Sequence, residues 1–126
     1  MNPSMILAVA GGSALGGVLR YGVARIWPMV PGGWPASTML VNLLGSLAIG
    51  VLSVVFAARE GVSEIGRVFW MVGVLGGFTT YSTFAIETVF LAEAAQLPRA
   101  IAYAVLTLVG CIVAAWVGRS LAGHWY

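Results

Sequence analysis

The sequence predicts an all-α membrane protein of four transmembrane helices, with a break in the third. The chain has 126 residues, of which 60% are hydrophobic and only 8% charged, too apolar a composition for a water-soluble domain. It contains four apolar segments long enough to cross a hydrocarbon core, which takes about 20 helical residues. The third of these segments is interrupted by a polar stretch at residues 76–83.

The four segments are separated by short loops. We expect spans at residues 5–27, 38–58, 68–92 and 100–121, which make residues 1–126 a single integral membrane domain. Prolines, glycines or clustered charges mark the loops at 28–35, 59–67 and 96–99. Because these loops are short, we expect consecutive helices to pack as antiparallel neighbours in one bundle. The first segment lacks the basic start and the cleavage site of a signal peptide, so it counts as a span.

The distribution of arginines bears on partners and on topology. The six arginines are scattered at segment ends, so we expect no nucleic-acid binding. With four spans, Arg59, Arg67 and Arg119 lie on the side of both termini, and Arg25 and Arg99 lie on the other. The positive-inside rule sets the orientation by an excess of positive residues on one side of the membrane, and three arginines against two give almost no excess. The chain is therefore suited to insertion in both orientations and to an antiparallel, dual-topology homodimer.

Small residues recur four apart within the spans, a spacing that lets helix backbones approach closely in lipid. Four helices packed this closely enclose little space, so a pore is more readily formed between two subunits than inside one. Cys111 lies in the middle of the fourth span and is most simply an apolar filler. The small residues in this pattern are Gly12 and Gly16, Ser46 and Gly50, and Gly110, Ala114 and Gly118.

The polar stretch of the third span starts with adjacent glycines at 76 and 77 and continues with four Ser or Thr residues within positions 79–83. Each glycine costs a helix interior about 1 kcal/mol relative to alanine, so we predict a break here. Non-helical backbone at this depth must be buried in protein or line an aqueous cavity, and we expect it at the dimer centre. Alternatively, the hydroxyls bond back to carbonyls one turn earlier and the helix only bends.

A broken helix offers carbonyls to a cation and N–H groups or hydroxyls to an anion. Tyr81 and Phe84 lie three apart and share a helix face. Ring edges suit an anion and ring faces suit a cation, although core packing is the simpler explanation of such a pair.

Two other spans place hydrogen-bonding groups at membrane depth. Asn42 supplies two amide donors from the second span, and Tyr103, Thr107 and Cys111 form a stripe on the fourth. Interhelical hydrogen bonding is the simpler explanation. A donor-rich path with few acidic groups is also what a small, strongly hydrated anion requires.

Arg20 and Glu87 are the only charges deep in the spans. They are candidates for a structural ion pair. Alternatively, Arg20 attracts anions to a vestibule, and Glu87 carries protons or anchors a helix.

Three of the spans carry distinctive motifs. The first span carries Gly11-Gly12-x-x-x-Gly16-x-x-x-Arg20-Tyr21 and the second carries Thr38-x-x-Val41-Asn42-x-x-Gly45. The third span carries the most specific motif, Gly76-Gly77-Phe78-Thr79-Thr80-Tyr81-Ser82-Thr83-Phe84-x-x-Glu87. Together these motifs resemble the CrcB/Fluc family of fluoride channels, and the resemblance covers essentially the whole chain.

The resemblance implies a dual-topology antiparallel homodimer in the cell inner membrane that passively exports fluoride through two pores and so protects the cytoplasm. It implies a structural sodium ion at the dimer centre, held by main-chain carbonyls at Gly76 and Thr79. The fluoride pathway that it implies is lined by Asn42, Tyr81, Ser82, Thr83, Phe84, Tyr103 and Thr107. The chain departs from the family where Tyr81 replaces a common phenylalanine and where Cys111 replaces a serine of some members.

Other functions fit the sequence less well. Small multidrug resistance transporters are also four-helix, dual-topology dimers, but they rely on a glutamate in the first helix, where this chain has Arg20. A proton-coupled cation antiporter is therefore the alternative function. We expect no enzyme activity, because a membrane lipid kinase would need an acidic cluster for magnesium and a phosphate-binding loop.

Overall fold

The computed structural model describes residues 2–59 and 61–125 and consists of helices joined by short loops. Within these residues, four helical segments are long and apolar enough to cross a membrane, as predicted. They are α1 (Pro3–Ile26), α2 (Ala36–Ala58), a third segment over Glu64–Glu93, and α6 (Leu97–Gly123). Each predicted span begins or ends within two residues of the corresponding observed span. The observed third span begins earlier in the sequence than predicted.

The third span is composed of four helical pieces. They are α3 (Glu64–Arg67), the π-helix η1 (Val68–Val74), α4 (Leu75–Phe78) and α5 (Tyr81–Glu93). The predicted break lies between α4 and α5, where Thr79 and Thr80 are extended with ψ of 159° and 114°. Thr79 Oγ1 does bond back to the Leu75 carbonyl at 2.9 Å, but the helix is interrupted and not merely bent. The π-helix has no distinctive sequence pattern and was not predicted.

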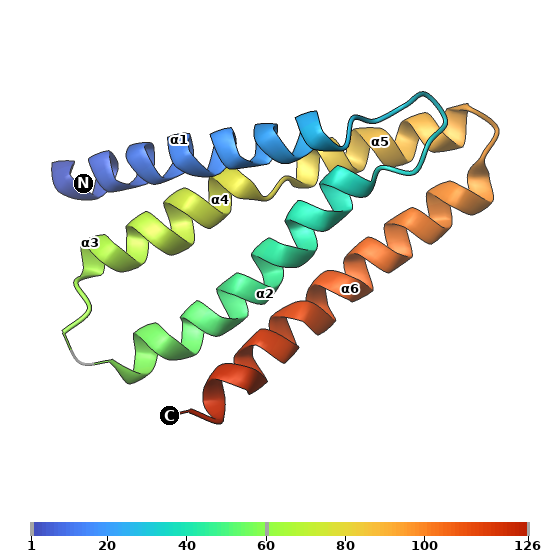
Figure 1. The fold of residues 1–126 in the computed structure, drawn as a ribbon. Coiled ribbons are helices and arrows are strands. Elements are labelled where there is room, and N and C mark those ends of the chain that lie inside the picture. The colour runs from blue at the N-terminus through green and yellow to red at the C-terminus, as the bar shows by residue number, and fades with distance from the viewer. Residues whose placement is uncertain (1, 60, 126) are drawn as a thin grey trace.

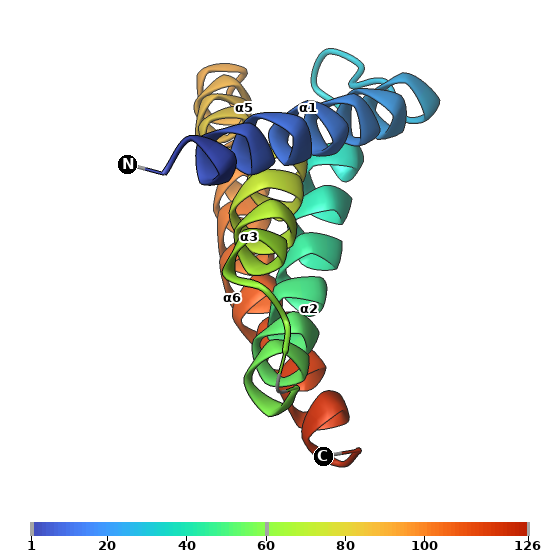
Figure 2. The ribbon, with the colours of Figure 1, turned by 90° about the vertical axis from the view of Figure 1, so that its left-hand side faces the viewer.

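The prediction that consecutive helices pack as antiparallel neighbours is confirmed where α5 packs against α6, but it misses the two most extensive contacts. α2 packs most extensively against α6, and α1 packs along η1 and α4, whereas α1 and α2 have only slight contact. α2 and α6 lie side by side and run in the same direction, while α1 crosses them at an angle (Figures 1 and 2). The reason is the position of the glycines, which permit close approach between these particular helices.

The predicted role of small residues in close packing is confirmed at both of these interfaces. A Cβ added at Gly12 would lie 2.5 Å from the Phe69 carbonyl oxygen, and one at Gly16 would clash with the backbone of Val74. Between α2 and α6, Gly50 lies against the Ala115 backbone and Gly118 against the Leu47 backbone. These contacts fix the distance between α2 and α6 and between α1 and the third span.

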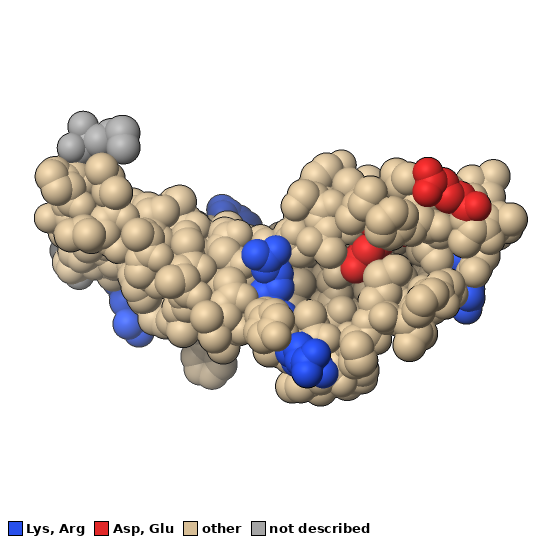
Figure 3. Space-filling view, turned by 90° about the horizontal axis from the view of Figure 1, so that it is seen from above, with Lys and Arg blue, Asp and Glu red and all other residues tan. Residues whose placement is uncertain are grey.

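Most of the surface of the molecule is apolar, as contact with lipid requires. Figure 3 shows one face with isolated basic and acidic groups on a largely uncharged background. Both termini lie toward one end of the bundle, opposite the loop between α1 and α2 (Figure 1). That loop is fastened to α6 by a 2.8 Å hydrogen bond from Arg99 to the Gly32 carbonyl.

Candidate ion site at the broken helix

The backbone at the break is held by the side chain of Asn42. Asn42 Nδ2 donates to the Thr80 carbonyl at 3.0 Å, and the Thr80 amide donates to Asn42 Oδ1 at 2.8 Å. Thr80 in turn caps α5, because its Oγ1 accepts a hydrogen bond from the Thr83 amide at 3.2 Å. Asn42 and Thr80 are 9% and 7% exposed. The second Nδ2 hydrogen of Asn42 remains available for another acceptor.

The break also frees carbonyl oxygens. In a continuous helix the Thr80 amide would donate to the Gly76 carbonyl, but here it donates to Asn42. Among the described residues, neither the Gly76 nor the Thr79 carbonyl accepts a hydrogen bond. A Cβ added at Gly76 would meet nothing within 4 Å, so the chain is open on that side. Unpaired carbonyls next to open space are a suitable donor set for a hard cation.

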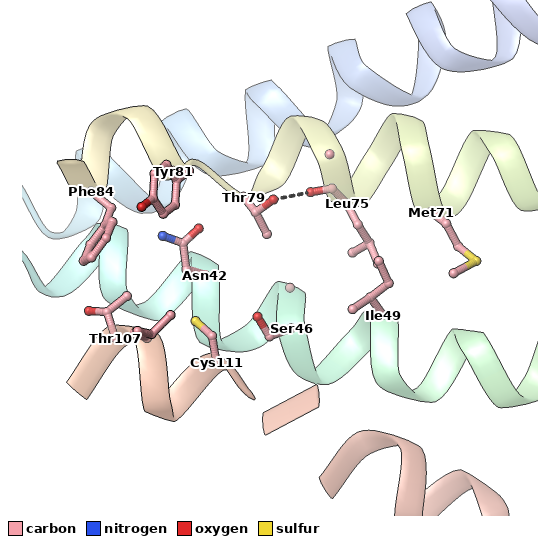
Figure 4. Close-up of a pocket in the computed structure, with 13 residues that line it drawn as sticks. Asn42, Ser46, Ile49, Met71, Leu75, Thr79, Tyr81, Phe84, Thr107 and Cys111 are labelled. Carbon is pink, nitrogen blue, oxygen red and sulfur yellow. Dashed lines mark hydrogen bonds between the residues drawn. The ribbon is translucent and has the colours of Figure 1, made fainter. Parts of the chain in front are cut away.

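A cavity of about 360 Å³ lies beside the break, between α2, the third span and α6 (Figure 4). The predicted sodium ligands and four of the predicted fluoride-pathway residues border this one cavity. No Asp, Glu, Lys or Arg is among the residues that line it. The lining comprises Asn42, Gly45, Ser46, Ile49, Met71, Leu75, Gly76, Thr79, Tyr81, Phe84, Thr107, Leu108 and Cys111.

Aromatic rings form one wall of this cavity and continue behind it. The Tyr81 and Phe84 rings lie 5.5 Å apart with an interplanar angle of 54°, which confirms that they share a face. Phe84 also contacts Tyr103, with ring centroids 5.3 Å apart, and Tyr103 meets Trp34 edge to face at 5.7 Å. Tyr81 is 78% exposed, whereas Tyr103 is completely buried. Tyr81 is therefore free to contact a ligand or a second subunit, while Phe84 is supported from behind.

Glu87 is buried and hydrogen-bonded by two hydroxyls. Thr38 Oγ1 donates to Oε1 at 2.8 Å, and the Tyr103 hydroxyl donates to Oε2 at 2.7 Å. These three side chains come from α2, α5 and α6, and all are at most 6% exposed. The network joins three helices directly behind the aromatic wall. It also commits the Tyr103 hydroxyl to Glu87.

Arg20 borders a second cavity, of about 270 Å³, on the other side of the break. Thr38, Thr80 and Thr83 line it as well. Arg20 forms no ion pair with Glu87 in the part of the chain that the structure describes, so the predicted structural pair is not present within one chain. The arrangement places Arg20 at a cavity lined by hydroxyl side chains and close to the N-terminal end of α5, which is a setting that favours anions.

Comparison with known proteins assigns the family. The family described as CrcB-like protein, Camphor Resistance (CrcB), matches residues 7–119. The chain belongs to this family. Relatives named fluoride-specific ion channel FluC occur in Methylobacterium nodulans (45% identity over 92% of each chain) and in Chloroflexus aurantiacus (42% identity over 96% of each chain). A third, in Methylobacterium sp. strain 4-46, is 40% identical over 94% of this chain and 95% of its own length.

The CrcB fold distributes the predicted fluoride-pathway and sodium-site residues over four places. Asn42, Tyr81, Phe84 and Thr107 meet at the larger cavity, together with Gly76 and Thr79. Thr83 faces the Arg20 cavity, and Tyr103 stands behind Phe84. Ser82 is exposed, with its hydroxyl 3.4 Å from that of Thr80.

Two polar residues of the site were missed. Thr38 lies in the second-span motif, one helical turn before Asn42, and that spacing was a usable signal. Ser46 was grouped with the small residues because it lies four residues before Gly50, and it was left out of the predicted fluoride pathway. In the structure it lines the larger cavity.

Proposed function

We propose that the protein is a passive, fluoride-selective ion channel that lets fluoride leave the cytoplasm and so lowers its toxicity. The observation that supports this most directly is the cavity beside the break, which is rich in hydrogen-bond donors and has no carboxylate in its lining. Family membership and the names of the relatives point the same way. In this proposal the protein moves an ion down its gradient and catalyses no reaction.

The chemistry of the cavity suits a small anion. Fluoride is strongly hydrated, so a pathway must replace its water with fixed donors. The second amide hydrogen of Asn42, the Thr107 hydroxyl and the ring edges of Tyr81 and Phe84 supply such donors. Arg20, beside Thr83 in the second cavity, raises the positive potential where an anion enters.

The functional unit in this proposal is an antiparallel homodimer. Tyr81 and Gly76 are exposed on one chain, next to the open backbone of the break. Lipid cannot satisfy such backbone groups, so another protein surface has to cover them. A second copy inserted in the opposite orientation covers the break with its own break, which agrees with the balanced arginines.

A sodium ion at the dimer centre fits the donor set at the break. The Gly76 and Thr79 carbonyls would hold it, and two antiparallel copies would supply two such sets. When bound, the cation neutralises the partial charges of carbonyls that have no hydrogen-bond donor. Its role in this proposal is structural, and it is not transported.

A proton-coupled cation antiporter is the competing function. Such a transporter needs an acidic residue that is accessible to both substrate and protons. Glu87 is 6% exposed and holds hydrogen bonds from Thr38 and Tyr103, which makes it a poor candidate. The geometry therefore favours the channel.

The test is a fluoride-electrode recording on purified protein reconstituted in liposomes loaded with potassium fluoride. With valinomycin to carry the countercharge, the channel releases fluoride without ATP or a pH gradient, and chloride-loaded liposomes release no chloride. Liposomes that retain fluoride but drive a lipophilic cation against an imposed pH gradient would identify the antiporter instead.

A further inference from the structure

Among the described residues, the Ser46 and Thr107 hydroxyls line the larger cavity and make no hydrogen bond. Thr107 is 3% exposed, and its Oγ1 is buried without a partner. Ser46 lines the same cavity, and its hydroxyl makes no hydrogen bond within residues 2–59 and 61–125. Leaving the buried Thr107 hydroxyl without a partner costs about 1–3 kcal/mol, so that group calls for an explanation. Ser46 is only partly buried, and its hydroxyl is open to whatever fills the cavity.

Other hydroxyls in these spans behave differently. Ser53 on α2 bonds back to the Gly50 carbonyl at 2.7 Å, and Thr88 on α5 bonds back to the Phe84 carbonyl at 2.8 Å. Back-bonding to the preceding turn is the usual way for Ser and Thr to be satisfied in a membrane helix. Ser46 and Thr107 leave this bond unmade, and both lie beside a cavity large enough for an ion and water. That combination indicates that their partner enters the cavity.

The parallel packing of α2 and α6 arranges the polar groups of the cavity at two successive levels along the helices, which we call steps. Gly110 lies beside Leu43, and Ala115 lies beside Gly50, so the two helices stay in contact along the cavity. Asn42 and Ser46 are one turn apart on α2, opposite Thr107 and Cys111, which are one turn apart on α6 (Figure 4). The first step is therefore Asn42 with Thr107, and the second is Ser46 with Cys111.

We propose that Ser46 is a fluoride-binding residue that receives the ion from Asn42 and Thr107. At this second step the Cys111 thiol is only a weak donor, so the Ser46 hydroxyl supplies the strong hydrogen bond. Beyond it the cavity is lined by Ile49, Met71 and Leu75, which have no donors in their side chains. Ser46 is thus the last strong side-chain donor along this wall. The inference rests on the proposed function and adds a residue to its pathway.

The test compares Ser46→Thr with Ser46→Val in the liposome flux assay. The two side chains have the same shape and differ in one hydroxyl, so packing is matched. A hydrogen bond to an anion is worth about 1.5–3 kcal/mol, which corresponds to roughly a tenfold or greater loss of flux for the valine variant. Ser53→Ala is the control on the same helix, because Ser53 does not line the cavity, and it keeps the flux of the unmutated protein.

A second variant separates ion binding from folding. Cys111→Ser places a hydroxyl on the same step from the opposite helix, so it restores flux when added to Ser46→Val. A merely misfolded Ser46→Val protein would not regain flux in this way. Equal flux for Ser46→Thr and Ser46→Val overturns the inference, and so does a loss that Cys111→Ser leaves unchanged. An unmutated protein that passes no fluoride overturns the proposed function and this inference together.

Discussion

The amide of Asn42 pairs with both backbone polar groups of Thr80, accepting from its N–H at 2.8 Å and donating to its carbonyl at 3.0 Å. One side chain on α2 thus replaces hydrogen bonds that the third span loses where it breaks. It also fixes the direction in which α5 leaves the break. The stability of the break and the shape of the cavity consequently depend on the same residue.

Asn42→Asp keeps the acceptor for the Thr80 amide but removes the donor to its carbonyl. An unsatisfied buried carbonyl costs about 1–3 kcal/mol, and the carboxylate adds negative charge to an anion cavity. We expect a lower melting temperature in detergent and loss of fluoride flux. Asn2→Asp is the matched control, because the Asn2 side chain only accepts a hydrogen bond from the Ser4 amide at the start of α1. An Asn42→Asp protein with unchanged melting and flux would show that the amide donor is dispensable.

Phe84→Ile removes a ring that touches both Tyr81 and Tyr103 and that supplies polarised edges to the cavity. We expect fluoride flux to fall while the protein still elutes at the same volume as the unmutated protein in size-exclusion chromatography. Tyr81→Phe keeps the ring and should keep most of the flux. If the isoleucine variant conducts like the unmutated protein, the aromatic wall has no part in permeation.

The Glu87 network predicts strong coupling between two hydroxyls that do not bond to each other. Thr38→Val and Tyr103→Phe each remove one donor to the buried Glu87 carboxyl group, and a buried acceptor left without its donor costs about 1–3 kcal/mol. The double variant leaves the carboxylate with neither donor, so its loss should differ from the sum of the single losses. A double-mutant cycle of unfolding free energies measures this. Additive losses would mean that the two hydroxyls act independently.

Gly16→Ala and Gly17→Ala form a matched pair on neighbouring positions of α1. A methyl group at Gly16 meets the Val74 and Phe78 backbone, whereas one at Gly17 meets nothing within 4 Å. Overpacking costs about 1–3 kcal/mol, so the first variant should unfold at lower temperature and the second should not. Equal melting temperatures would show that α1 does not approach the third span this closely.

Sodium removal should weaken the assembly if the Gly76 and Thr79 carbonyls hold this ion between subunits. A ligand at 100 times its Kd stabilises the state that binds it by about 2.7 kcal/mol. Replacing sodium with N-methyl-D-glucamine should therefore lower the melting temperature and increase the fraction of monomer in detergent. The gain in melting temperature should saturate as the sodium concentration rises. An equal gain with every monovalent cation would mean that ionic strength, and not a sodium site, stabilises the assembly.

The sequence by itself determined the membrane class, the four spans and the location of the break. Apolar length predicts the spans, because a helix that crosses the hydrocarbon core needs about 20 predominantly apolar residues. The glycines and hydroxyl residues at 76–83 are unusual in such a helix, and they predict the break. The motifs also determined the family. These features depend on local composition and spacing, which a single sequence displays directly.

Only the tertiary structure decided which helices are neighbours and what each polar side chain contacts. Loop lengths suggested sequential packing, but glycine contacts at Gly50 and Gly118 bring α2 beside α6. This pairing places Ser46 opposite Cys111 in a cavity, although its spacing from Gly50 suggested a packing residue. Glu87 likewise meets Thr38 and Tyr103 and not Arg20. Such contacts depend on the rotation and register of helices far apart in sequence, and backbone packing between helices sets them.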